Sequence, residues 1–284
     1  MVCKALMEAG THSPFVERVM ENLPGSFRRL SFMDPSVISV RSLGNFKVML
    51  GDQELNQEQW VSAKARDLLA YFVTFRGDSS PAEKAYEAIW AEKPGRSLMA
   101  FHTALTRLRK ALRSREPSPR YILVESGEYY LDAARFKIDL DEFDAALANA
   151  RAASGDEIAI RWLEHAIGLY QGEYMQNLYY DWLIPERVRV SQQYLGALRQ
   201  LADFHFAHER YTRSLDLLHR ALRLDNLQEE LHCQAMHVYT ALGDRAGLMR
   251  QYQSLVDVLA EELGIDPLPS TKKLYNHLLM GMQS

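Results

Sequence analysis

Cysteine and long apolar runs are both scarce in this chain of 284 residues. Its two cysteines, Cys3 and Cys233, fit neither a disulfide framework nor a CxxC metal pattern, which favours a reducing compartment. No apolar run approaches the roughly 18 residues that a membrane span needs, and the N-terminus has no signal-peptide pattern. We therefore predict a cytoplasmic protein with no membrane partner.

The sequence motifs of nucleotide chemistry and covalent catalysis are missing as well. There is no GxxxxGK[ST] phosphate loop, no nucleophile elbow and no carboxylate pair with catalytic spacing. His205 lies three residues before His208, and His232, Cys233 and His237 form a second group, but spacing alone defines no third metal ligand. Histidines in helical repeats are more often core or groove residues. We predict no enzymatic activity, no cofactor and no metal.

Charge is modest overall, at −4, but it is unevenly distributed. Residues 37–134 hold 14 Lys and Arg against 12 Asp and Glu, whereas residues 135–284 hold 15 against 21. The acidic half is a poor DNA binder and is better suited to protein contacts. We predict a first domain at 37–134 and a second at 135–284. The segment 1–36 is interpreted as the end of a longer upstream region.

A cationic segment lies between residues 96 and 120, where six arginines and one lysine face the single acid Glu116. Apolar residues recur there with helical spacing, which predicts a helix over 97–113. Its buried stripe comprises Phe101, Leu105, Leu108 and Leu112. A helix with one apolar stripe and a cationic, threonine-bearing back suits a DNA major groove. A solvated cationic helix with no nucleic-acid role is the alternative.

Short elements surround this helix on both sides. Alternation at 38–50 predicts a small antiparallel sheet, and residues 62–75 predict a helix. The run Ser80-Pro81-Ala82-Glu83 predicts a capping box that opens a further helix. After the cationic helix, residues 121–131 predict a hairpin that turns at 125–128. Sheet, helix, helix, cationic helix and hairpin is the order of a winged helix-turn-helix domain.

Past Lys137 the periodicity is helical almost to the end of the chain. Two segments are self-similar at a spacing of 35 residues, close to the 34-residue tetratricopeptide period. In this alignment Leu201, Phe204, Glu209 and Arg210 correspond to Met236, Tyr239, Asp244 and Arg245. The predicted fold is mainly α with a small β component: a winged helix-turn-helix domain followed by an all-α, tetratricopeptide-like helical-repeat domain. An aromatic cluster at Tyr170, Tyr174, Tyr179, Tyr180 and Trp182 is either repeat core or a ligand groove.

Two family resemblances accompany these patterns. At 43–46, 64–69, 89–90, 105–112 and 127–131 the chain resembles the OmpR/PhoB-type winged-helix DNA-binding domain, in the variant found in SARP activators. Residues 136–282 resemble the bacterial transcriptional activation domain (BTAD) that follows it, with matching runs at 171–174, 181–187, 242–245 and 261–267. The resemblance implies a transcriptional regulator, most commonly an activator. Its expected partners are double-stranded promoter DNA, RNA polymerase and a second copy of the chain.

The same resemblance assigns roles to residues of the cationic helix. Arg107 is expected to read bases by bidentate bonding to guanine, together with Thr103 and Thr106. Lys110, Arg113 and Arg96 are expected to contact phosphates. Arg109 and His102 complete the predicted DNA-binding residues.

The sequence departs from the family pattern at two places. Ala104 stands where relatives often have a polar residue, which indicates a weak or unusual sequence preference. The wing tip at 125–128 carries two glutamates where relatives often have an arginine, which favours a different function. The alternative function is a protein-interaction scaffold whose winged helix does not bind DNA.

Overall fold

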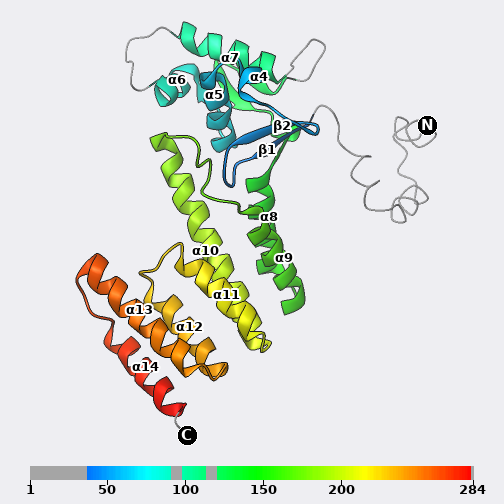
Figure 1. Ribbon diagram of the computed structural model, residues 1–284. Coiled ribbons are helices and arrows are strands. Elements are labelled where there is room, and N and C mark those ends of the chain that lie inside the picture. The colour runs from blue at the N-terminus through cyan, green and yellow to red at the C-terminus, as the bar shows by residue number, and fades with distance from the viewer. Residues whose placement is uncertain (1–36, 91–97, 113–119, 283–284) are drawn as a thin grey trace, which may run out of the picture.

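The computed structural model describes residues 37–90, 98–112 and 120–282. Two parts lie end to end (Figure 1): a compact part that contains the sheets, and a stack of helices that extends to the C-terminus. None of the helices in the described ranges combines the length and the apolar character that crossing a bilayer requires.

The first sheet contains the strands expected at 38–50 and two further strands. Its first three strands pair antiparallel: β1 (Ile38–Arg41), β2 (Lys47–Leu50) and β3 (Gln53–Glu54). Ile38, Val40 and Val48 are buried, as the alternation predicts. A fourth strand, β7 (Phe136–Ile138), then pairs parallel with β1. The expected division between residues 134 and 135 falls directly before β7, where the chain returns to the N-terminal sheet.

Four helices complete the compact part: α4 (Gln57–Trp60), α5 (Ala63–Thr74), α6 (Ala82–Trp90) and α7 (Met99–Ala111). The helix expected at 62–75 is confirmed as α5, whereas α4 was not predicted. The expected capping box at Ser80 is wrong. Ser80 and Pro81 form strand β4, and the buried Ser80 hydroxyl bonds the Tyr71 hydroxyl at 2.9 Å, because a buried hydroxyl needs a polar partner.

The predicted hairpin is confirmed as β5 (Ile122–Glu125) and β6 (Glu128–Leu131). The two residues between the strands both have positive φ, 52° at Ser126 and 87° at Gly127. This geometry is that of a type I′ turn, whose twist matches the twist of the flanking strands. β4 pairs with the other side of β6 and makes a second, three-stranded sheet.

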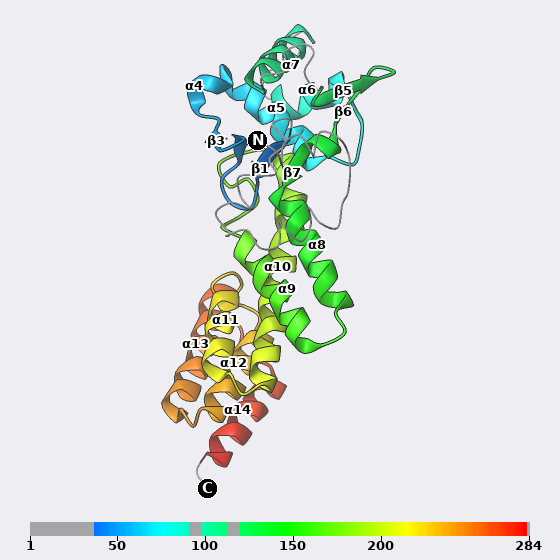
Figure 2. The same ribbon diagram turned by 90° about the vertical axis from the view of Figure 1, so that its right-hand side faces the viewer.

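The rest of the chain is helical. After the 3₁₀ turn η1 (Ala133–Arg135) and β7, its helices are α8 (Asp139–Ala152), α9 (Asp156–Leu169), α10 (Ile184–Ala207), α11 (Tyr211–Leu222), α12 (Glu229–Ala241), α13 (Arg245–Leu263) and α14 (Pro269–Gly281). Helices adjacent in the chain pack as pairs, α8 with α9, α10 with α11, and α12 with α13. Figure 2 shows these pairs stacked below the compact part, with α14 at the far end.

The repeat is real, but its spacing is 34 residues and not the expected 35. The N-cap of α11 is Arg210 and that of α13 is Asp244. The positive-φ residue in the preceding turn is Glu209 in one pair and Gly243 in the other. Side-chain similarity shifted the alignment by one residue, because Glu209 resembles Asp244 chemically while occupying the turn position of Gly243. Backbone geometry therefore gives the tetratricopeptide period.

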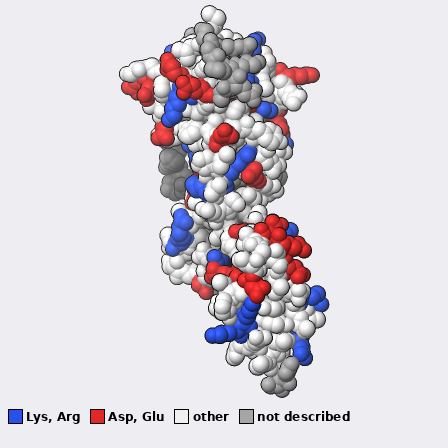
Figure 3. All heavy atoms as spheres, turned by 90° about the vertical axis from the view of Figure 1, so that its left-hand side faces the viewer, with Lys and Arg blue, Asp and Glu red and all other residues white. Residues whose placement is uncertain are grey.

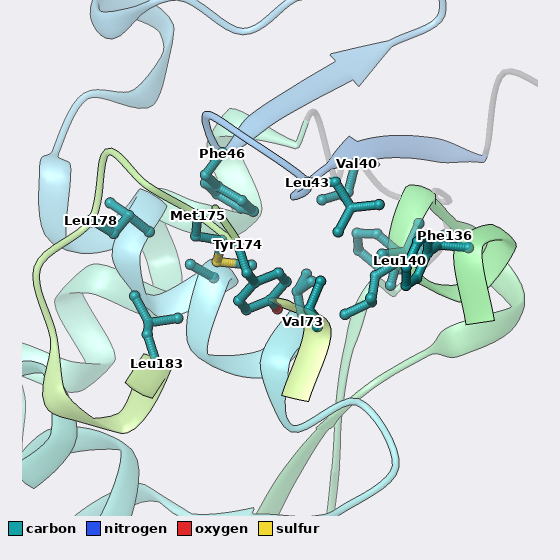
Figure 4. Close-up of a cluster of buried hydrophobic side chains, with 14 of the residues drawn as sticks. Val40, Leu43, Phe46, Val73, Phe136, Leu140, Tyr174, Met175, Leu178 and Leu183 are labelled. Carbon is teal, nitrogen blue, oxygen red and sulfur yellow. The ribbon is translucent and has the colours of Figure 1, made fainter. Parts of the chain in front are cut away.

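One hydrophobic core runs through the sheets, the compact helices and the first helical pairs. Residues 170–183, called here the junction segment, lie between α9 and α10, and 3₁₀ turn η2 (Asp181–Leu183) ends the segment. Figure 4 shows Tyr174 and Met175 of this segment gathered with Phe46 and Val73 of the compact part. The two parts therefore share a core and are not joined by a bare linker.

Candidate nucleic-acid interface

The predicted buried stripe of α7 is confirmed. Phe101, Leu105, Leu108 and Leu112 are all at most 3% exposed, and α7 packs against α4, α5 and α6. Ala104 is only 3% exposed as well. It belongs to the packed face, so a polar side chain at this position would point into the domain and not toward a ligand.

The opposite face of α7 is exposed, and it carries six of the predicted DNA-binding residues: His102, Thr103, Thr106, Arg107, Arg109 and Lys110. Both views place α7 at the end of the molecule remote from α14 (Figures 1 and 2). The helical repeats therefore leave this face open. The side chains of Arg107 and Lys110 make no hydrogen bond or ion pair within the described part of the chain and are exposed, so their charges face solvent.

The hydroxyl protons of Thr103 and Thr106, two of the predicted DNA-binding residues, are already donated within α7. Thr103 Oγ1 donates to the Met99 carbonyl oxygen at 2.7 Å, and Thr106 Oγ1 donates to the His102 carbonyl oxygen at 2.8 Å. In this rotamer each hydroxyl offers only its lone pairs outward. Both threonines are thus arranged to accept hydrogen bonds from an approaching group, such as the exocyclic amine of cytosine or adenine.

Arg109 is directed differently from Arg107. Its Nη2 lies 3.4 Å from the carbonyl oxygen of Ile122 in β5. The side chain therefore reaches back to the hairpin and links α7 to the wing. Arg96 and Arg113 lie outside the described residues. The N-cap position of α7 is Leu98, which offers no side-chain cap.

The wing presents negative charge at its tip. Glu125 and Glu128 are directly opposite each other in the β5–β6 register, and both are exposed. Ser79 Oγ donates to a Glu128 carboxylate oxygen. Like charges facing across a strand pair repel each other, and they would also repel a phosphate backbone.

A hollow of about 390 Å³ lies beside the outward face of α7. Its walls include Ser62 and Lys64 from the start of α5, and Thr103 and Arg107 from α7. Lys64 also lies at the junction segment. Its Nζ donates to the Ile89 carbonyl oxygen at 2.6 Å and to the Tyr180 hydroxyl oxygen at 3.0 Å. This lysine connects the helical repeats to the wall of the candidate interface.

The junction segment holds α5 and α6 through further polar contacts. The Tyr180 hydroxyl donates to Asp67 Oδ2 at 2.6 Å, and Trp182 Nε1 donates to the Ala88 carbonyl oxygen at 3.2 Å. Asp67 is only 5% exposed. Sequence reasoning assigned no role to Lys64 or Asp67, although a charged residue inside the apolar stripe of α5 was a visible signal.

Backbone pairing ties the junction segment to the turn after β1. The N–H groups of Gln171 and Gln176 donate to the carbonyl oxygens of Leu43 and Gly44 at 3.1 and 2.9 Å. Gly44 has a φ of 126°, which L side chains rarely adopt. Leu43 also bridges to Tyr174. These bonds set the position of the compact part relative to the repeats.

The five residues of the aromatic cluster lie in different environments. Tyr174 is fully buried core, and burial raises the pKa of its hydroxyl well above the ordinary value, although a hydrogen bond to Thr74 opposes the shift. Tyr180 and Trp182 are half-buried and stack on each other at the junction. Tyr179 is 88% exposed. Tyr170 lines a cavity in the repeats.

The histidines that suggested a metal site have other partners. His208 Nδ1 lies 2.7 Å from the Phe204 carbonyl oxygen, and His232 lies between the Asn226 carbonyl oxygen and Gln251. Burial lowers the pKa of His205, His232 and His237. Across the described ranges, no three His, Cys, Asp or Glu side chains are grouped as metal ligands.

Figure 3 shows one face of the molecule, on which acidic and basic side chains are intermixed over both parts. The face carries no continuous basic stripe among the described residues.

The chain is similar to a known protein family and to several regulatory proteins. The family model of the bacterial transcriptional activator domain matches residues 138–279. The transcriptional regulatory protein MoaR1 of Mycobacterium tuberculosis is 29% identical over 223 residues, which cover 76% of this chain and 72% of MoaR1. The regulatory protein AfsR of Streptomyces coelicolor is 28% identical over 223 residues, 77% of this chain but only 22% of AfsR.

A solved structure of Mycobacterium tuberculosis EmbR, in complex with a low-affinity phosphopeptide, has the same fold. The TM-score is 0.72 at 22% identity, over 86% of this chain and 65% of EmbR. The predicted fold class, with a winged-helix part and a helical part, is thereby confirmed. Because the family model covers half of the chain and the relatives are named as transcriptional regulators, the chain belongs to the bacterial transcriptional activator domain family as a SARP-type transcriptional regulator and is not an enzyme.

Proposed function

We propose that this regulator binds double-stranded promoter DNA through α7 and acts as an activator. The carrying observation is the division of α7 into two faces. Four large side chains hold one face in the core, while Arg107 and Lys110 are exposed on the other with no partner in the described chain. A rigid cationic helix of this kind fits the major groove, where Arg reads guanine and Lys holds phosphate.

The proposed domain division follows the predicted one. Residues 37–134 bind DNA as an OmpR/PhoB-type domain, and residues 135–284 form the activation domain. The acidic repeats then offer a surface to RNA polymerase or to a second protomer. The excess of acidic side chains over residues 135–284 supports a protein partner for this part. Cytoplasmic localisation is part of the same proposal, since promoter DNA is the ligand.

Selection of bound duplexes from a random pool, followed by footprinting, tests the proposal. We expect an enriched sequence and a protected site on it. The logarithm of the affinity for the selected duplex should fall linearly with log salt, because lysine and arginine contacts release counterions from the backbone. A pool that shows no enrichment, together with no measurable affinity for duplex at low salt, would refute DNA binding.

A protein-interaction scaffold is the second candidate, and the wing favours it. Glu125 and Glu128 face each other at the tip, where a DNA-binding wing would need positive or neutral side chains. The same titration separates the two functions. The scaffold predicts no salt-dependent association with duplex DNA, whereas the regulator predicts a steep negative slope.

A further inference from the structure

The helical repeats contain a cavity of about 580 Å³ between α9, α10 and α11. Its volume lies in the range of small-molecule sites, roughly 300–1,000 Å³. The floor is apolar and is formed by the buried side chains of Ile167, Leu201 and Leu217. The cavity is far from α7 and is used by neither the family assignment nor the proposed DNA contact.

His205 lines this cavity and is incompletely bonded. Its residue exposure is 2%, and its Nδ1 has no hydrogen-bond partner within the described chain. Burial, and then the nearby Arg210 and Arg213, lower the pKa of the imidazole, so the ring is neutral near pH 7. A neutral imidazole offers one donor and one acceptor. A buried Nδ1 without a hydrogen-bond partner costs folding free energy, and a bound polar group that pairs with it would remove this cost.

One face of α11 supplies charges of both signs to the cavity. Arg213, Asp216 and Arg220 follow helical spacing and all line it, and Glu164 of α9 lines it from another helix. None of the four makes an ion pair with another within the described chain, although both signs are present. The Arg220 guanidinium is held in place, because its Nη2 donates to the Tyr194 hydroxyl oxygen at 2.6 Å and it lies 5.9 Å from the ring centroid.

We propose that this cavity binds a small zwitterionic ligand of the amino-acid type. Arg213 and Arg220 take the carboxylate, since planar guanidinium groups bind carboxylates with paired hydrogen bonds. Glu164 and Asp216 face the ammonium group, and the apolar floor takes the side chain. A ligand with only negative charge would meet the two carboxylates, and one with only positive charge would meet the two arginines. The mixed lining therefore selects a molecule with both charges.

The cavity adjoins the segment that positions the compact part. Tyr170 and Gln171 line it, and the Gln171 N–H donates to the Leu43 carbonyl oxygen. Tyr170 also stacks on Tyr194 with ring centroids 3.9 Å apart. A ligand held against these residues restrains the start of the junction segment. We infer that occupancy changes DNA affinity, an inference that rests on the proposed function.

Isothermal titration calorimetry of the full chain, without DNA, tests the site. The probes are the free amino acids with apolar or aromatic side chains. Phenylalanine is compared with 3-phenylpropionate, which lacks the amine, and with phenethylamine, which lacks the carboxylate. We expect at least one amino acid to bind and each single-charge analogue to bind about tenfold more weakly. No binding by any amino acid, or equal binding by its single-charge analogues, would overturn the proposal.

Variants of α11 locate the site. Arg213→Gln and Asp216→Asn should each lower the affinity for the amino acid about tenfold. Arg223→Gln is the matched control, since Arg223 is an exposed arginine close to the same helix that does not line the cavity. Both tested residues are exposed, and circular dichroism verifies folding. Equal affinity in Arg213→Gln and Arg223→Gln would place binding elsewhere and overturn the assignment.

A duplex titration with and without the bound amino acid tests the coupling. We expect a shift of duplex affinity that disappears in Arg213→Gln. If duplex affinity is unchanged at saturating amino acid, the coupling to DNA binding is refuted, whereas the ligand site measured by calorimetry is not. A chain that binds the amino acid but no duplex would refute the proposed DNA function and leave the ligand site intact.

Discussion

The Ser42 backbone N–H lies 2.8 Å from Asp139 Oδ1, and the Ser42 hydroxyl donates to the same oxygen at 2.6 Å, although 97 residues separate the two. The N–H of Leu43 donates to the other oxygen at 3.0 Å. Asp139 is the first residue of α8, where a carboxylate also interacts favourably with the helix dipole. One side chain thus joins the end of β1 to the first helix of the repeats.

Replacing Asp139 by Asn should lower the free energy of unfolding by about 1–3 kcal/mol, because it removes charge-assisted bonds to a buried serine. Urea denaturation measures the change. Asp156→Asn is the matched control, since Asp156 is the first residue of α9 and is exposed. It should cost no more than about 1 kcal/mol. Equal effects would mean that the helix dipole accounts for the contribution of Asp139.

Arg107→Ala should reduce affinity for the selected duplex by about 1–3 kcal/mol and relax its sequence preference. Lys110→Ala should weaken all duplexes alike and reduce the slope of log affinity against log salt by about 1. The physical difference is that one contact reads a base and the other a phosphate. Fluorescence anisotropy at several salt concentrations measures both. Arg161→Ala, an exposed arginine on α9, is the control and should change neither quantity.

Gly247→Ala should destabilise the protein by about 1–3 kcal/mol, although alanine usually favours a helix. A Cβ at this position would lie 2.3 Å from Tyr239 Cδ1 and 2.5 Å from Asp244 Oδ2. Gly196→Ala, in the middle of α10 with nothing within 4 Å, should instead stabilise by about 0.5–1 kcal/mol. Thermal denaturation of the two variants should therefore give midpoint shifts of opposite sign. Shifts of the same sign would show that Tyr239 moves away at little cost.

The stability of the repeats should depend on pH through their histidines. Burial lowers the pKa of His205, His219, His232 and His237 below the ordinary 6.5. Below about pH 6.5 the unfolded chain therefore binds protons that the folded chain does not. The neutral histidines therefore contribute stability that is fully present above about pH 6.5 and is lost as the pH falls below it. Urea midpoints should be lower at about pH 5.5 than at about pH 7.5, and His232→Gln should reduce the difference. Equal midpoints would show that these histidines titrate alike in both states.

Local patterns predicted most elements because each pattern reflects one face in contact with one core. The stripe of α7, the strands at 38–50 and the hairpin followed from spacing and turn residues alone. Prediction was wrong where one side chain suits two different structural roles. Ser80 has the chemistry of a helix cap, but its hydroxyl bonds Tyr71, and its backbone continues into the sheet.

By itself the sequence determined the order of the main elements, the mainly helical fold class, the outward cationic face of α7 and the presence of a helical repeat, since these depend on periodicity and composition. Only the tertiary structure decided that β7 pairs with β1, that Asp139 bonds Ser42 and that residues 170–183 hold α5 and α6. Each of these contacts joins residues far apart along the chain. No local pattern encodes which distant backbone groups or charges come together, because packing of the whole core decides it.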